Sequence, residues 1–191
     1  MILTVSDNVE LCKDLHRFFL QKGAFSRFVS FVNLPDFVKC DTKSIDFAII
    51  DGSSSKKDVR FACEIVAEYF PSAQIEIFAH IDQLKELFVN APTDVGIQGL
   101  KVSTLDHTAR LLGYPLRLTK NEYKILLLLL CEKRIFSADE ILDLAFPFSE
   151  NASKNQLAVH VCNINKKATL ISGRRLIINP HKNGYTLNSR I

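Results

Sequence analysis

The chain has 191 residues, of which 47% are hydrophobic, so it is long enough for two small domains that each bury a core. Its longest apolar run, residues 125–131, is too short to span a bilayer, and its first residues lack the basic and apolar regions of a signal peptide. Five scattered cysteines without a Cys-x-x-Cys pair predict reduced thiols rather than a disulfide framework or a zinc site. We therefore expect a cytosolic protein without a membrane segment.

The net charge of +3 hides an asymmetry between the two halves of the chain. Residues 1–99 hold 10 Lys+Arg and 14 Asp+Glu, whereas residues 100–191 hold 14 Lys+Arg and 7 Asp+Glu. An acidic half followed by a basic half indicates that only the second half meets a polyanion such as nucleic acid. The alternative is that the two domains differ by a few charges without functional consequence.

The first half alternates short apolar runs with amphipathic stretches. The pattern predicts strands over residues 1–5, 25–32, 45–50 and 74–79, and helices over residues 8–22, 34–40, 56–70 and 81–89. The run 45–50 is apolar throughout, as in a strand that is buried on both faces. Alternating strands and helices predict an α/β domain with a parallel sheet, which we place at residues 1–98.

The second half, residues 99–191, has a different pattern. Alternating apolar positions over residues 99–118 predict antiparallel strands, and residues 119–132, 137–145 and 155–170 predict three helices. Thr119 with Glu122, and Ser137 with Glu140, have the spacing of a capping box at a helix start. Residues 175–187 predict a hairpin that turns at residues 180–184.

The second and third of these helices have the spacing of a helix-turn-helix, in which the second helix of the pair enters the major groove of DNA. The predicted outer face of helix 155–170 is amide-rich and basic, and amides can bond adenine while lysines neutralise phosphate. The candidate DNA-binding residues on or near this helix and at the hairpin tip are Asn155, Gln156, His160, Asn163, Asn165, Lys166, Lys167, Arg174, His181 and Lys182. The alternative for the polar face is an ordinary solvated helix surface, and the alternative for His160 is a histidine at the edge of the core.

Three stretches in this half resemble one known domain. They are Leu118-Thr119-Lys120-Asn121-Glu122-Tyr123, the segment Leu157-Ala158-Val159-His160-Val161, and Lys182-Asn183-Gly184-Tyr185-Thr186-Leu187. In this order and at these separations they resemble the winged helix-turn-helix DNA-binding domain of OmpR/PhoB-type response regulators. The resemblance implies double-stranded DNA as a partner, and contact with RNA polymerase through residues 146–154.

The resemblance is incomplete at the residues that bind DNA. In the family, arginines follow the Val-His-Ile core of the recognition helix, and here those positions fall on Cys162, Asn163 and Asn165. His181 stands where the family has an arginine in the wing. Asparagine in place of arginine predicts a weaker salt-dependent part of binding and a preference for A·T pairs.

The first half resembles a receiver domain, which is flavodoxin-like, because Asp51 ends the buried third strand. In receivers this aspartate accepts a phosphoryl group from a histidine kinase, beside Mg²⁺ held by an acidic pair after the first strand. Here that pair is Ser6 and Asp7, and the family's Thr or Ser after the fourth strand corresponds to Ala79 or His80. The Lys-Pro pair that follows the fifth strand in the family has no clear match here. The stretch of about 20 residues that should hold a fifth strand and a fifth helix is shortened or absent. We therefore expect a degenerate receiver. Asp51 would be phosphorylated only if the remaining carboxylates still bind Mg²⁺.

We therefore predict a receiver-like, truncated α/β domain followed by a winged helix. The predicted function is a sequence-specific transcription regulator that acts as a homodimer without phosphorylation, and that needs no cofactor. Two alternatives remain open: a phosphorylation-regulated response regulator with a histidine kinase partner, and a protein-binding adaptor that has lost DNA. An enzyme is not expected, since no catalytic or metal-ligand spacing is visible.

Overall fold

The computed structural model describes residues 1–40, 45–87, 94–97, 99–180 and 184–188. The chain divides into two compact units: the first comprises Met1–Phe19 and Phe25–Asn90, and the second comprises Leu20–Ala24 and Ala91–Ile191. No helix within the described ranges combines the length and the apolar character needed to cross a membrane.

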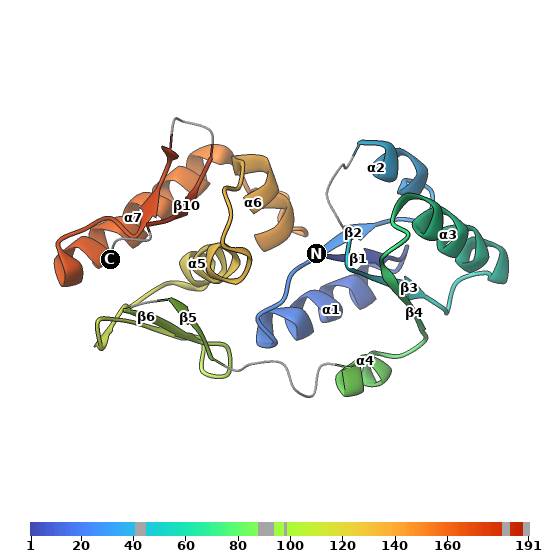
Figure 1. The fold of residues 1–191 in the computed structure, drawn as a ribbon, viewed down its shortest axis with the longest axis horizontal. Coiled ribbons are helices and arrows are strands. Elements are labelled where there is room, and N and C mark those ends of the chain that lie inside the picture. Colours follow the sequence, from blue (N-terminus) through green and yellow to red (C-terminus); the bar gives the residue numbers. More distant parts are fainter. Residues whose placement is uncertain (41–44, 88–93, 98, 181–183, 189–191) are drawn as a thin grey trace. The chain divides into compact units, whose positions relative to one another are not determined.

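The first unit is an α/β domain with a four-stranded sheet (Figure 1). Its elements are β1 (Ile2–Val5), α1 (Val9–Gln21), β2 (Ser26–Val29), α2 (Leu34–Cys40), β3 (Phe47–Asp51), α3 (Lys56–Tyr69), β4 (Gln74–Phe78) and α4 (Ile81–Leu87). All neighbouring strands are parallel, in the order β2-β1-β3-β4. Over the described residues this is the flavodoxin-like order without a fifth strand, and the predicted receiver-like fold is confirmed.

The central strands of this sheet are buried as their composition predicts. Ala48, Ile49 and Ile50 in β3 have no exposed surface, whereas β4 ends the sheet with the polar residues Gln74 and Glu76. The second strand is shorter than predicted and ends at Val29. Backbone N–H groups of Asn33 and Leu34 bond the carbonyl of Ser30, so the chain turns into α2 there.

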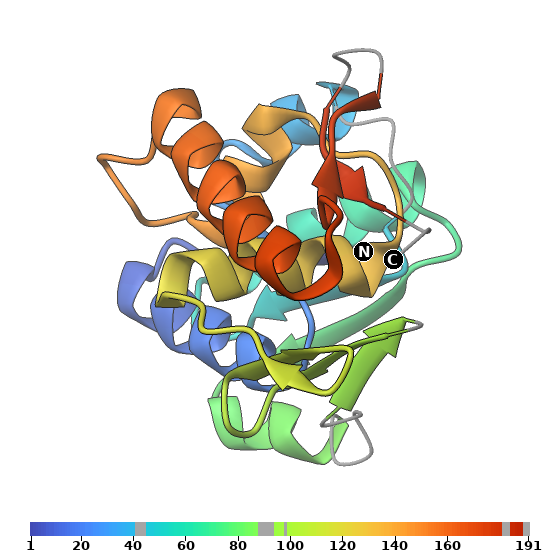
Figure 2. The same cartoon turned by 90° about the vertical axis from the view of Figure 1, so that its left-hand side faces the viewer.

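The second unit is a winged helix. It comprises β5 (Asp94–Ile97), β6 (Leu100–Ser103), β7 (Thr108–Leu111), β8 (Tyr114–Pro115), α5 (Lys120–Glu132), α6 (Ala138–Ala145), α7 (Lys154–Ser172), β9 (Ile177–Ile178) and β10 (Thr186–Leu187). Strands β5 to β8 form an antiparallel sheet, and β9 and β10 pair as the wing (Figure 2). We predicted the boundary between residues 98 and 99; the pairing of β5 with β6 puts residues 94–97 with this unit.

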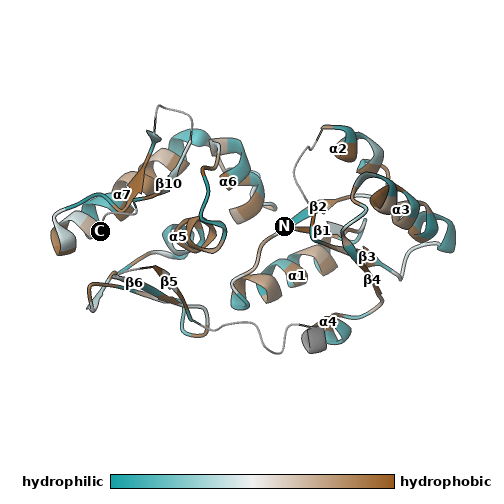
Figure 3. Cartoon of the chain, in the orientation of Figure 1, coloured by the Kyte–Doolittle hydropathy of each residue, from teal (hydrophilic) through white to brown (hydrophobic). Residues whose placement is uncertain are grey.

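Helix α5 forms the centre of this core. Its residues Ile125 to Leu130 are all buried, and their apolar colour follows the helix in Figure 3. Both predicted capping boxes are present, at Thr119 for α5 and at Ser137 for α6. The Tyr123 hydroxyl donates a hydrogen bond of 3.0 Å to the carbonyl oxygen of Ser103, and burial raises the pKa of Tyr123 to about 12.

A buried ion pair joins α5 to α7. The side chain of Glu122 is 2% exposed, and one of its oxygens accepts a hydrogen bond of 2.6 Å from Nζ of Lys167 and one of 2.8 Å from the N–H of Thr119. Burial acts to raise the pKa of Glu122, but the bond and charge of Lys167, together with the Thr119 bonds, outweigh it and lower the pKa. The pair therefore holds α7 against the start of α5.

A β-bridge joins the wing to the loop before α6. The N–H of Phe136 bonds the carbonyl of Tyr185 at 2.9 Å, and the N–H of Tyr185 bonds the carbonyl of Phe136 at 2.7 Å. Gly184 precedes this bridge with a φ of 135°, and a Cβ there would lie 2.2 Å from the Phe136 oxygen. Only glycine allows this close approach.

We predict that Gly184→Ala lowers the free energy of unfolding by about 3 kcal/mol, because it adds a collision and breaks the two bridge hydrogen bonds. The matched control is Gly113→Ala. Gly113 also has a positive φ, of 84°, but open space at the Cβ position, so only about 1 kcal/mol is expected. Urea unfolding of the full chain measures both. Equal losses in the two variants would contradict the bridge as the reason for glycine.

We predict that Lys167→Gln lowers the free energy of unfolding by about 2 kcal/mol at pH 7, because a buried carboxylate loses its cation. Lys154→Gln on the same helix breaks an exposed pair with Asp139 and should cost less than about 0.5 kcal/mol. Since the folded-state pKa of Glu122 lies below its ordinary value of 4.5, its contribution is present above pH 4.5 and disappears as the pH falls through the lowered pKa. Urea unfolding between pH 3 and pH 7 tests this, and a pH-independent difference between wild type and Lys167→Gln would refute it.

Candidate nucleic-acid interface

Helix α7 has one buried face and one exposed face. It starts at the N-cap Ser153, whose hydroxyl accepts from the N–H of Gln156, and it ends at Gly173 in the left-handed conformation. Its buried face consists of Leu157, Val161, Ile164 and Ala168, as the sequence pattern predicts. The opposite face is therefore presented outward along 19 residues.

Three of the predicted DNA-binding residues lie together at the N-terminal end of α7. Asn155, Gln156 and His160 line an open cleft of about 480 Å³. Its opposite wall consists of Asn121, Ser149 and Asn151, from the first turn of α5 and the loop before α7. None of these wall residues was among the sequence candidates. For Asn121, its position in the first turn of the predicted helix was the sequence signal that could have identified it.

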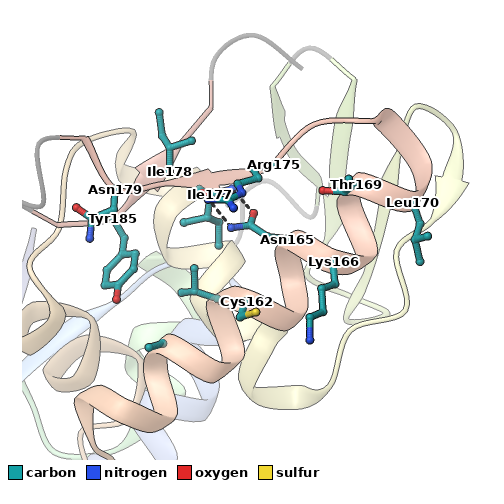
Figure 4. A pocket seen from close by; sticks show the side chains of 12 residues that line it. Cys162, Asn165, Lys166, Thr169, Leu170, Arg175, Ile177, Ile178, Asn179 and Tyr185 are labelled. Carbon is teal, nitrogen blue, oxygen red and sulfur yellow. Dashed lines mark hydrogen bonds between the residues drawn. The ribbon is translucent and has the colours of Figure 1, made fainter.

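A second groove lies between α7 and the wing, with a volume of about 920 Å³ (Figure 4). The predicted residues Asn165 and Lys166 line it, together with apolar residues that include Ile177 and Ile178. Asn165 is also part of the fold: its side-chain amide donates 2.8 Å to the Ile177 carbonyl and its oxygen accepts 2.8 Å from the Ile177 N–H. This pair of bonds fixes the wing strand β9 to α7.

The cationic side chains of this region differ in their exposure and in the ion pairs that they form. Lys167 is bound to Glu122, and Lys154 at the helix start is paired with Asp139 at 2.9 Å. Lys166 is exposed and makes no ion pair within the described part of the chain, and Arg174 is exposed after the end of α7. The predicted residues His181 and Lys182 lie outside the described residues.

The middle of the outward face is not basic. Asn163 is half-buried there, and Val159 is 58% exposed beside it on the same face. Cys162, one turn beyond Val159, is also exposed. Within the Val-His-Val motif, the structure buries Val161, as the sequence pattern predicts, and turns Val159 outward.

In the first unit, Asp51 lies at the end of β3 and is 1% exposed. The Ser6 hydroxyl donates 2.6 Å to one carboxylate oxygen. The other oxygen accepts 2.9 Å from the Ser53 N–H and 2.6 Å from the Ser53 hydroxyl. Both oxygens of the phosphoacceptor candidate are therefore hydrogen-bonded inside the protein.

The other predicted residues of this site form hydrogen bonds with residues other than Asp51. Asp7 is exposed and accepts 3.1 Å from the N–H of Phe31. The N–H groups of Ala79 and His80 both face the Gln83 side-chain oxygen, at 2.8 and 3.4 Å, where they cap α4. No group of three or more His, Cys, Asp or Glu that could hold a metal is found over the described ranges.

Comparison with known proteins matches residues 113–187 to the family described as transcriptional regulatory protein, C terminal. No curated protein sequence matches the chain. Among solved structures, the DNA-binding domain of the response regulator AdeR, in complex with an intercistronic region, is 23% identical, with a TM-score of 0.43. That match covers 49% of this chain and 96% of the other.

Two further structures are similar over 98% of both chains. One is described as a family of redox sensors in the streptococci that evolved from two-component response regulators, at 13% identity and a TM-score of 0.46. The other is the response regulator DrrB of Thermotoga maritima, an OmpR/PhoB homologue, at 17% identity and a TM-score of 0.45. Residues 113–187, from β8 to β10, therefore form a winged helix that matches this transcriptional regulatory family, and a receiver-like unit with a parallel sheet precedes it.

Proposed function

We propose that the chain is a sequence-specific transcription regulator whose binding to double-stranded DNA does not depend on phosphorylation. The observation that carries the proposal is the outward face of α7, where exposed amides and Lys166 stand over a helix whose other face is buried. Such a helix fits the major groove, and its amides suit adenine.

The candidate residues divide into two groups by what they bond. Asn155, Gln156, His160, Asn163 and Lys166 are offered to DNA from α7, joined by Arg174 after it, and the proposal includes His181 and Lys182 from the sequence alone. Asn165 bonds the wing strand β9, and Lys167 bonds Glu122 in α5. We therefore assign both side chains the role of positioning α7, with contact to DNA as a lesser role. With these two side chains engaged, binding relies more on neutral hydrogen bonds than on released counterions.

Phosphorylation independence is supported by the surroundings of Asp51. Transfer to an aspartate needs an accessible carboxylate and Mg²⁺ held by neighbouring oxygen ligands. Asp51 is 1% exposed, and its two carboxylate oxygens accept hydrogen bonds from Ser6 and from Ser53. The residues present do not fit a Mg²⁺ site, and we assign the first unit a role in dimerisation or sensing.

The partners proposed for this function follow the family. A homodimer would occupy repeated half-sites about one helical turn apart. RNA polymerase would meet the loop between α6 and α7, residues 146–154. In this loop the N–H of Ser149 bonds the Phe146 carbonyl and the N–H of Ala152 bonds the Ser149 carbonyl, which gives it a defined surface.

Selection of random-sequence duplexes by the purified protein tests the proposal, with wild type and Asp51→Asn compared before and after treatment with acetyl phosphate and Mg²⁺. Asparagine has the shape of aspartate and keeps one of its two acceptor oxygens, but it cannot be phosphorylated. We expect both proteins to enrich one repeated motif with equal affinity under all conditions. Tighter binding by treated wild type alone would favour the phosphorylation-regulated alternative, and no enrichment would favour the adaptor.

Two identical substitutions on α7 separate base contact from positioning. We predict that Asn163→Ala leaves the free energy of unfolding within about 0.5 kcal/mol of wild type but reduces discrimination between A·T and G·C by about 1 kcal/mol or more at one position. Asn165→Ala should instead lower the free energy of unfolding by about 2 kcal/mol, because two backbone groups of Ile177 lose their partner. Urea unfolding and competition binding with single base-pair variants measure both. The reverse assignment of effects would refute the division.

A further inference from the structure

Val159 is an apolar side chain that lies outside the hydrophobic core of the second unit. It is 58% exposed in the middle of the outward face of α7, while the core is filled by Leu157 and Val161 on the other face. It also lines the cleft at the start of the helix, whose other walls are amides, a hydroxyl and an imidazole. In a free protein this valine only adds apolar surface to water.

The neighbours of Val159 define what it would meet on DNA. Asn155 lies four residues before it and Asn163 four residues after it, so the three side chains stand in one row along the helix. In the major groove the one apolar group on the base edges is the C5-methyl of thymine, and amides pair with adenine. A row of amide, valine and amide matches a run of A·T pairs.

We infer that Val159 recognises the C5-methyl group of thymine in the bound half-site, a specificity contact that rests on the proposed function. The branched side chain suits this role, since valine in a helix is held in one main χ1 rotamer and places its methyl groups with little loss of entropy. Leu170 is more exposed, at 88%, but it lies eleven residues further along, about 16 Å at 1.5 Å per residue. That distance exceeds the width of about 12 Å of the major groove, so it would not contact the same bases.

Deoxyuridine in place of thymidine tests this contact, because it removes the methyl group and leaves base pairing intact. The probe is the duplex enriched by wild type, with each thymidine of one half-site replaced in turn. We expect wild type to bind about fourfold more weakly at one or two positions, the ratio given by about 0.8 kcal/mol for one buried methyl group. For Val159→Ala, the ratio between thymidine and deoxyuridine duplexes at those positions should fall toward one.

Val32→Ala is the matched control, since Val32 is 82% exposed in the first unit and loses the same two methyl groups. It should keep the wild-type ratio. A wild-type ratio near one at every thymidine would overturn the inference while DNA binding stands, and so would a fourfold ratio that persists in Val159→Ala. Failure to enrich any duplex would instead overturn the proposed function, and the inference with it.

Discussion

The burial of residues 125–130 in α5 constrains the rest of the second unit. Residues 125–130 have almost no exposed surface, so the helix is covered on every side. The sheet at β5, the helices α6 and α7, and the wing strand β10 supply that cover. Because each of these elements has one apolar face to give to α5, their other faces are turned outward, and the outward face of α7 is a consequence of the leucine run.

Apolar cover alone does not set the rotation of α7 about its axis or the position of the wing. Two polar contacts do so, from residues two positions apart in the second half of the helix. Lys167 bonds the buried Glu122, which also caps α5, and Asn165 bonds both backbone groups of Ile177 in β9. These bonds are directional and their partners are buried or half-buried, so a small rotation of the helix would leave polar groups without a partner.

Features of the fold that depend on local spacing could be predicted from the sequence, whereas features that depend on tertiary contacts such as these two could not. The element order, both capping boxes and the buried face of α7 follow from local spacing, and the structure has them all. The sheet lacks a fifth parallel strand after α4 in the described ranges, as the shortened spacing indicated. Strand β5 was missed because Asp94–Ile97 is short and contains Gly96, and its pairing with β6 is a tertiary fact.

At the candidate site, the residue types were predictable and their partners were not. Asn165 and Lys167 look like readers of DNA in the sequence, because amide and ammonium groups on a helix suit that role. Only the distances to Ile177 and Glu122 reveal that both side chains are engaged. Likewise, Asp51 has the position of a phosphoacceptor, and only the bonds from Ser6 and Ser53 reveal that its oxygens are occupied.

The charge left on the outward face of α7 then decides how such a protein would discriminate between sequences. Phosphate neutralisation by cations adds affinity for every duplex alike, whereas hydrogen bonds and methyl contacts at base edges distinguish one duplex from another. With Lys167 paired to the buried Glu122 and Lys154 paired to Asp139 at the surface, the face keeps its amides, Val159 and Lys166, while two of its cations are engaged in ion pairs. On a face of this kind the ratio of specific to non-specific binding depends more on base contacts than on total charge.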